Sequence, residues 1–298
     1  MTNSEYERLK ELIETNILKY LPNKDANNRK LIESMEYSLA AGGKRLRPIL
    51  LLAAYDMFSE DESSALPFAC ALEYIHTYSL IHDDLPGMDN DDLRRGKPTN
   101  HKVFGEGMAI IAGDGLLNCA YEIMLNDIKS CNPTDSKLSS SKILAAAEIA
   151  ASAGAKGMIA GQALDIDLEL DFSKEQLNYI HEKKTGALLV SSVKAGALLG
   201  GATNEDVLKL EMFGKNLGLA FQIKDDLLDI YGDEAILGKA IGSDAKLEKK
   251  TYPFVFGEKQ SIEILNNCHK QAISALESFG NRGKFLIEIV NQLEFRIK

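Results

Sequence analysis

The 298-residue sequence contains few cysteines and no long apolar run. Its four cysteines lie far apart, with no Cys-x-x-Cys pair and no histidine at zinc-site spacing. Such thiols are typical of a reducing compartment and not of a disulfide framework. No stretch of 18 apolar residues, the length that suggests a transmembrane helix, is present. Residues 1–20 form a charged amphipathic pattern rather than a signal peptide, so we expect a cytoplasmic protein that does not enter a membrane.

The sequence also lacks a basic run of any length. It has 34 Lys and Arg against 44 Asp and Glu, a net charge of -10 and a pI near 5.1. An acidic chain of this kind is a poor candidate for binding nucleic acid or an anionic membrane surface. An anionic substrate would have to meet locally gathered Lys and Arg side chains, or a metal ion held by the excess acid.

Proline is scarce, and patterns typical of β-strands are almost absent. Only seven prolines occur, most of them where a helical pattern begins or ends. Alternating β-branched runs bounded by turn residues are so rare that we expect no sheet. The predicted fold is therefore all-α, with long loops at 85–104 and 232–252. Helical periodicity predicts helices at 4–20, 28–41, 46–58, 64–84, 106–127, 138–154, 156–168, 174–198, 204–231, 259–279 and 282–296.

No linker, low-complexity tract or solenoid-period repeat divides the chain. We therefore predict a single domain over residues 1–298, a large helical bundle with its functional residues at one end. Residues 143–168 are rich in Ala and Gly and carry little charge. Because a helix that is apolar on most sides is buried, we expect this segment inside the bundle.

An acidic cluster lies within the helical run around residue 225. Asp225 and Asp229 are four residues apart, so their carboxylates project from one helix face, with Asp226 beside them. Like charges at this spacing repel by roughly a few tenths of a kcal/mol on an isolated helix. A bound divalent cation would reverse this cost, and a solvated acidic face is the simpler alternative.

A second acidic cluster begins at Asp83 and Asp84 and continues to Asp89. On an unbroken helix, Asp83 and Asp89 would point about 240° apart. Pro86-Gly87 breaks the helix, which allows Asp89 to turn back towards Asp83. Carboxylate oxygens suit Mg²⁺, which keeps several waters and binds through a few carboxylates plus substrate phosphates.

Basic residues lie directly after the acidic cluster at Asp83, and others lie upstream of it. The motif LRRGKPT follows the acids directly, and GGKRLRP at 42–48 is a basic loop that opens a helix. Arg binds phosphate oxygens bidentately, and Lys supplies a point charge. Taken alone, GGKRLRP is structural as often as functional. Beside two Mg²⁺-type sites it indicates two phosphorylated groups, one held by metal and the other by the basic loop.

Together these motifs resemble the trans-isoprenyl diphosphate synthase family. DDLPGMDNDDLRRGKPT and FQIKDDLLD are similar to its first and second aspartate-rich motifs. GGKRLRP, HEKKTGALL and LGKAIGSDAKLEKKTYP resemble its remaining blocks, in the right order over residues 40–255. The short first motif with Pro-Gly is similar to bacterial farnesyl diphosphate synthases and to bacterial and plant geranylgeranyl synthases. The resemblance implies a helical bundle of the isoprenoid synthase type with a central active-site cavity.

The resemblance implies a Mg²⁺-dependent prenyltransferase. Such an enzyme joins isopentenyl diphosphate head to tail with dimethylallyl and geranyl diphosphate, and we expect farnesyl diphosphate as the product. Six aspartates would hold three Mg²⁺ ions around the allylic diphosphate: Asp83, Asp89 and Asp225 directly, and Asp84, Asp226 and Asp229 through water or hydrogen bonds.

The resemblance also assigns the two diphosphate sites residue by residue. The allylic diphosphate would contact Arg94, Lys184 and Lys239. Isopentenyl diphosphate would be held by Lys44, Arg47, His76 and Arg95, with backbone access at Gly43. Thr185 and Gln222 would place oxygen dipoles beside the developing cation. No dedicated protein base is expected, because the released diphosphate can take the proton, and His82 beside the metal site stays unassigned.

Product length should be set below the acidic cluster at Asp83. Tyr78 and Ser79 precede Asp83 by five and four residues, so both lie about one turn deeper along the helix. The resemblance implies that an aromatic residue at Tyr78 is typical of fifteen-carbon enzymes with the short motif. We hypothesise that the Tyr78 ring limits chain growth, and an ordinary core tyrosine is the alternative.

Other functions fit the motifs less well. A class I terpene cyclase would show an N-x-x-[S/T]-x-x-x-E pattern where this chain has DDLLD. A non-catalytic partner subunit that binds prenyl diphosphates would usually lose one aspartate cluster, and both are present. Geranyl or geranylgeranyl diphosphate remains an alternative product. The resemblance also implies a homodimer, for which apolar helices such as 106–127 offer an interface.

Overall fold

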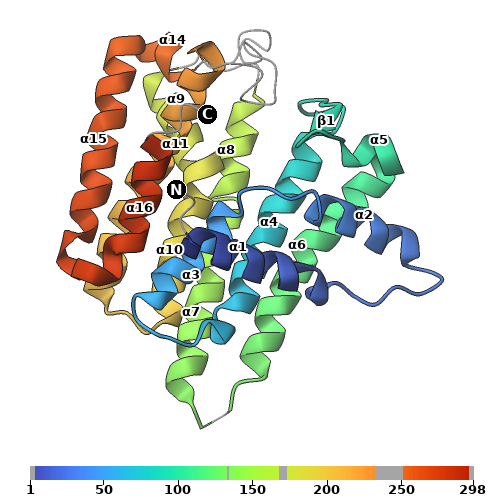
Figure 1. The fold of residues 1–298 in the computed structure, drawn as a ribbon. Coiled ribbons are helices and arrows are strands. Elements are labelled where there is room, and N and C mark those ends of the chain that lie inside the picture. Colours follow the sequence, from blue (N-terminus) through green and yellow to red (C-terminus); the bar gives the residue numbers. More distant parts are fainter. Residues whose placement is uncertain (1–3, 133, 168–172, 232–250, 295–298) are drawn as a thin grey trace.

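The computed structural model describes residues 4–132, 134–167, 173–231 and 251–294 (Figure 1). Helices make up about four fifths of the described chain, which confirms the predicted all-α fold. The predicted helices are present, and their ends differ from the prediction by a few residues. The helices are α1 (Ser4–Asn16), η1 (Ile17–Tyr20), α2 (Arg29–Leu39), α3 (Leu46–Asp56), η2 (Glu62–Ser64), α4 (Leu66–Asp83), α5 (Asn100–Phe104), α6 (Glu106–Lys129), α7 (Ser136–Ala153), α8 (Met158–Asp165), α9 (Lys174–Ile180), η3 (His181–Gly186), α10 (Ala187–Leu199), α11 (Asn204–Tyr231), α14 (Tyr252–Phe256), α15 (Glu258–Leu276), η4 (Glu277–Gly283) and α16 (Lys284–Glu294).

The segment 85–104, predicted as a loop, contains a small β-ribbon and the short helix α5. Strands β1 (Leu93–Arg94) and β2 (Lys97–Pro98) pair in antiparallel register. Arg95 and Gly96 between them have φ angles of 54° and 74°, the left-handed conformation of a two-residue type I′ turn. The prediction that the chain has no sheet is therefore wrong for this segment. Strands of two residues are too short to show an alternating pattern in the sequence.

Helix α10 lies at the centre of the bundle and packs against α3, α7 and α11. It buries side chains on nearly every face between Leu188 and Leu199. Gly196 allows α10 to approach α3 closely, because a β-carbon there would overlap the backbone of Leu51. One hydrophobic cluster that includes α10 extends from Leu9 in α1 to Val290 in α16, so the first and last helices share one core.

Of the segment 143–168, the described residues 143–167 lie largely at the surface, so the prediction that this segment is buried on most sides is wrong. Helix α7 buries one stripe, through Ala145, Ile149 and Ala153. The apolar composition instead includes large side chains at exposed positions of α6, α7 and α8, and these side chains are here called the α6–α8 apolar face. Its large side chains are Ile110, Ile111, Leu125, Ile143, Leu144 and Ile159. In Figure 1, α6 and α7 extend from the bundle and meet at the bottom of the view.

Two helical segments have the length and apolar composition of membrane-spanning helices, namely Glu106–Lys129 and Ser136–Asp165. Core helices of globular proteins also reach this length and apolarity. Of the apolar window in the first segment, 44% is buried inside the bundle. The expectation that the chain does not enter a membrane stays a prediction.

The predicted helix 174–198 is present but changes its winding in the middle. Helix α9 begins after Ser173, whose side chain accepts a hydrogen bond from the Gln176 amide in a capping box. Residues His181–Gly186 then form the π-helical turn η3 before α10 begins. Such turns within α-helices are frequent at functional sites, and η3 carries Lys184 and Thr185.

Candidate active site

The acidic cluster at the end of α4 turns back on itself. Helix α4 ends at Asp83, and Pro86-Gly87 follows within one turn. The amide of Asp89 donates a hydrogen bond of 2.9 Å to the carbonyl oxygen of Asp83. Asp89 therefore lies next to Asp83, as the helix break at Pro86-Gly87 predicts.

The carboxylate of Asp83 is largely withdrawn from water. The side-chain amide of Gln162 donates to Asp83 Oδ1 at 2.9 Å. Burial raises the pKa of Asp83 to about 6; the positive charge of Lys184 opposes this shift, and the negative charge of Asp89 adds to it. Burial and the repulsion from Asp89 disfavour the charged form of Asp83, and a bound divalent cation would offset both effects. The donor atoms are all oxygens, which suit Mg²⁺ better than zinc.

The neighbouring Asp84 faces a different partner. Arg94, at the end of β1, donates to Asp84 Oδ1 through Nε at 2.7 Å and through Nη2 at 2.6 Å. Asp84 is only 3% exposed, and burial raises the pKa of Asp84 while its bonds to Arg94 lower it. This pair anchors the β-ribbon to α4. Direct contact of Arg94 with a diphosphate, and of Asp84 with a metal, stay predictions.

Arg47 and His76 form one basic wall. Arg47 Nη1 lies 3.2 Å from His76 Nε2, across the packed helices α3 and α4. Withdrawal from water lowers the pKa of His76 well below its usual value, and the charge of Arg47 lowers it further. The same withdrawal lowers the pKa of Arg47 to about 10. A neutral histidine beside a charged arginine places one buried cation here, which suits an anionic ligand.

The basic loop before α3 lies against the turn of the β-ribbon. Arg95 Nη1 donates to the carbonyl of Gly42, and the Arg95 guanidinium lies over Gly43. The carbonyl of Lys44 accepts a hydrogen bond of 2.6 Å from the Tyr6 hydroxyl. The structure thus brings Gly43, Lys44 and Arg95 together, although they come from segments about fifty residues apart.

The structural role of Arg45, in the middle of the same loop, was not predicted from the sequence. Its φ is 52°, a strained value for a residue other than glycine. The buried guanidinium bonds to Glu73 Oε1 at 2.7 Å and to the carbonyl of Leu39 at 2.6 Å. These contacts hold the loop in place. A detectable signal was present, because Glu73 is the single acid between Leu66 and His82 and stands among mostly apolar residues.

Part of the acidic cluster and the basic wall line a cavity of about 510 Å³ between α4, α6, α8 and η3. The predicted residues that line it are Arg47, His76, Tyr78, Ser79, Asp83, Lys184 and Thr185. Much of the remaining lining is apolar, including Leu117, Met158 and Ile159. The cavity therefore joins an acidic end, a basic wall and an apolar interior.

Lys184 reaches the cavity from η3 and is paired with an acid of α8. Its Nζ lies 2.6 Å from Asp165 Oδ2. Gly161 makes this approach possible, because a β-carbon there would overlap the Lys184 backbone. Sequence reasoning missed both Gln162 and Asp165. They are two polar residues, three apart, in an apolar run, and so share one helix face.

The acidic cluster around residue 225 lies on α11, with Asp226 and Asp229 buried. Asp226 Oδ2 accepts a 2.9 Å hydrogen bond from the Tyr252 amide and lies 3.8 Å from His181 Nε2. Burial lowers the pKa of His181 to about 4, against the opposing charge of Asp165. Asp226 thus joins α11 to the start of α14, as Asp84 joins α4 to the β-ribbon.

Asp225 and Gln222 are partly buried on α11. Asp225 borders a small recess together with Phe221 and His269. Helix α11 packs against η3, where Gly218 lies close to Gly186. The placement of Asp225 opposite Asp83 stays a prediction, and Lys239 lies outside the described residues.

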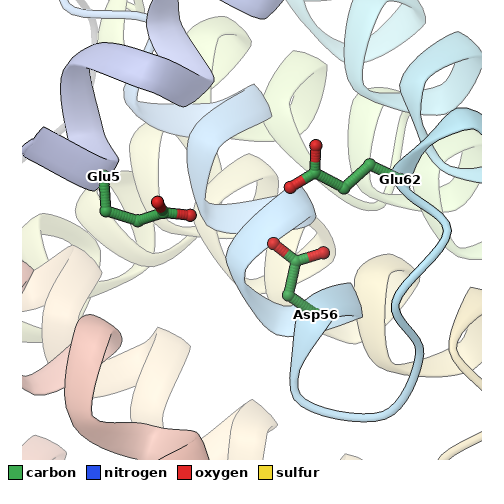
Figure 2. A group of neighbouring side chains, drawn as sticks. All are labelled: Glu5, Asp56 and Glu62. Carbon is green, nitrogen blue, oxygen red and sulfur yellow. The ribbon is translucent and has the colours of Figure 1, made fainter.

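A separate acidic group is formed by Glu5, Asp56 and Glu62, from α1, α3 and η2 (Figure 2). Arg8 donates to Glu5 at 2.7 Å and to Glu62 at 2.9 Å. None of these three acids lines the 510 Å³ cavity. The group is an ion network that ties α1 to the end of α3, and not part of the site.

Comparison with known proteins gives matches over nearly the whole chain. Residues 28–279 match the family described as Polyprenyl synthetase. The chain is 51% identical over 285 residues to a farnesyl diphosphate synthase of Geobacillus stearothermophilus, covering 94% of each protein. It is 46% identical over 268 residues to a chloroplastic geranylgeranyl pyrophosphate synthase of Capsicum annuum, covering 89% of this chain and 71% of that protein. The crystal structure of an FPP/GFPP synthase from Zymomonas mobilis aligns with a TM-score of 0.84 at 33% identity, covering 98% and 97% of the two chains.

Proposed function

The chain belongs to the polyprenyl synthetase family of trans-prenyltransferases, and we propose that it makes farnesyl diphosphate. The substrates would be isopentenyl diphosphate and, in turn, dimethylallyl and geranyl diphosphate. One observation carries the proposal: a single cavity has Asp83 at its acidic end, Arg47 and His76 on its basic wall, and an aromatic ring in its lining.

The acidic end fits a metal-bound diphosphate. Asp83 and Asp89 would hold Mg²⁺, together with Asp225 on α11, and we propose three ions for the complete site. When bound, the metal supplies positive charge that stabilises the departing diphosphate. Gln162 fixes the orientation of the Asp83 carboxylate through its hydrogen bond. Lys184 is placed to exchange Asp165 for a phosphate oxygen, since its Nζ already lies at the cavity.

The basic wall fits the second diphosphate. Arg47 keeps its charge beside a neutral His76, whose Nε2 accepts from Arg47 Nη1, so a phosphate group would gain a charged donor here. Arg95, which bonds to the carbonyl of Gly42, and the backbone of Gly43 would extend this basic surface. Isopentenyl diphosphate held here would direct its double bond towards the carbon that the allylic diphosphate leaves.

The apolar interior protects the allylic cation. Leu117 and Met158 line the cavity, and they would exclude water that could otherwise react with the cation. Thr185 borders the same space, where its oxygen can face developing positive charge. No side chain of the chain is needed as a base, because the released diphosphate can accept the proton.

The proposal of a fifteen-carbon product depends on Tyr78. Its ring is 6% exposed and lines the cavity one turn below Asp83. Burial raises the pKa of Tyr78 to about 12, so the ring is neutral and bulky at physiological pH. The alternative is geranylgeranyl diphosphate, which the 46% identity to the Capsicum annuum synthase supports.

The deciding experiment is chromatography of the products formed from isopentenyl and dimethylallyl diphosphate with Mg²⁺. A main fifteen-carbon product supports the proposal, and a main twenty-carbon product supports the alternative. Binding of both substrates without release of pyrophosphate would instead support a non-catalytic partner subunit.

We further propose that the chain forms a homodimer through the α6–α8 apolar face. This surface carries Leu144 at 56% and Leu125 at 61% exposure, and large apolar side chains gathered on a surface are typical of protein interfaces. Light scattering should give twice the chain mass of 32.7 kDa. Leu144→Glu should give the monomer mass, whereas Leu208→Glu, on an exposed position of α11, should leave the dimer intact. A native monomer would overturn this assignment.

A further inference from the structure

His82 lies in the lining of the cavity, between the tyrosine ring and the first metal-site aspartate. It follows Tyr78 by one helical turn on α4 and directly precedes Asp83. Its side chain is 28% exposed and borders the cavity. The roles proposed above for the diphosphates, the metal and the chain-length floor do not use it.

The imidazole of His82 makes three contacts, of which the longest joins Nε2 to Asp114 Oδ1 at 3.9 Å; the other two fix its position. Nε2 lies 3.0 Å from the carbonyl oxygen of Ile110 on α6, so an Nε2–H tautomer donates a hydrogen bond across the two helices. The ring also packs against Tyr78, edge to face, with centroids 5.7 Å apart and planes at 80°. Such aromatic pairs add roughly 0.5–1.5 kcal/mol beyond the area they bury.

Gly113 provides the space that this position requires. A β-carbon on Gly113 would overlap Nε2 and Cδ2 of the imidazole. Gly113 is in the middle of α6 with ordinary helical φ, so backbone conformation does not explain a glycine here. Glycine inside a helix costs roughly 0.5–1 kcal/mol relative to alanine, and the absence of a β-carbon lets the ring sit against α6.

The geometry points to His82 as a positioning residue for product length. The Ile110 carbonyl and Gly113 fix the imidazole, the imidazole fixes the Tyr78 ring, and that ring closes the cavity floor. Side chains on a helix lean towards its N-terminus, so the His82 ring lies over Tyr78 and limits its rotation. This inference rests on the proposed function, because it concerns how far the prenyl chain can grow.

Three substitutions separate the hydrogen bond from the ring. His82→Phe keeps a ring against Tyr78 and loses the bond to Ile110, His82→Gln keeps a donor at the position of Nε2 and loses the ring, and His82→Ala loses both. We expect His82→Ala to raise the ratio of longer to fifteen-carbon products roughly two- to tenfold, the range that one aromatic pair supports. His82→Phe and His82→Gln should each restore part of the native ratio.

Gly113→Ala tests the same contact from α6. It should lower kcat/KM for geranyl diphosphate in the native background, because the imidazole must leave its position. Adding His82→Ala should remove this effect, since the overlap is then gone, which is the coupling that a double-mutant cycle measures. Gly107→Ala, on the same helix with no atom within 4 Å of its added β-carbon, is the matched control and should leave kcat/KM unchanged.

The measurements are product chromatography and steady-state kinetics, with a thermal melt of each variant to verify folding. A native product ratio in folded His82→Ala, or an equal effect of Gly113→Ala with and without His82, would overturn the positioning role. If the unmodified chain forms no prenyl diphosphate, the proposed function itself fails, and that result is separate from either outcome.

Discussion

The guanidinium group of Arg95 lies so close to Gly43 that a β-carbon on Gly43 would stand 2.5 Å from Arg95 Cζ. The φ of Gly43 is 129°, which also disfavours any side chain. The basic loop before α3 and the β-ribbon after the acidic cluster thus meet at a glycine, and their relative placement depends on it.

Gly43→Ala should therefore weaken isopentenyl diphosphate binding. We expect its KM to rise roughly tenfold, about the value of one hydrogen bond to a charged group, with a smaller change in KM for geranyl diphosphate. Gly42→Ala is the matched control: its φ is also positive, at 78°, but its added β-carbon meets no atom within 4 Å. Equal effects of the two substitutions would show that backbone strain, and not Arg95, is responsible.

Asp83→Asn should lower kcat on the order of 10²- to 10³-fold, the usual cost of losing one electrostatic contact to the transition state. The substitution keeps the shape and can still bond to Gln162, but it removes the charge that faces the metal. Chelation of divalent metal should abolish native activity, and Mg²⁺ should restore it. Glu62→Gln, in the separate acidic group of Figure 2, should change neither activity nor metal dependence.

Tyr78→Ala should lengthen the product, because removing a ring that is 6% exposed opens the floor of the cavity. Chromatography should show twenty-carbon or longer chains in place of the fifteen-carbon product. Tyr78→Phe keeps the ring and should keep the native length. An unchanged farnesyl product from Tyr78→Ala would refute the assignment of Tyr78 as the floor.

His181 should make the fold less stable in acid. Its pKa is lowered to about 4 by burial, whereas an unfolded histidine titrates near 6.5. The unfolded chain therefore binds more protons, and stability is lost as pH falls from about 6.5 to 4. The loss due to His181 is at most about 3 kcal/mol. Urea unfolding of His181→Phe should show less pH dependence than the native chain in this window, and an equal slope would contradict the assignment.

The sequence was sufficient for the features that depend on local pattern. Helical periodicity predicted the helices, and Pro86-Gly87 predicted the turn that returns Asp89 to Asp83. The ordered motifs identified the family. Each of these signals lies within a few residues of the feature it predicts.

Features that depend on contacts between distant segments were not predicted. The Arg45–Glu73 pair joins residues 28 apart, and the bond from Gln162 to Asp83 joins residues 79 apart. The error at residues 143–168 has a related cause, because apolar composition does not distinguish a central helix from one whose apolar side faces outwards. Only the packing of α10 against three neighbours shows which helix is central.

The π-helical winding of η3 has a consequence for which changes this region can tolerate. A π turn holds one residue more than an α turn, so everything beyond it is rotated by about 100° relative to what precedes it. Deleting one residue between 181 and 186 would restore regular winding and remove the turn that carries Lys184 and Thr185 to the cavity. The number of residues in this turn is therefore more tightly constrained than their identity. Homologous proteins should differ here by substitutions and not by insertions or deletions.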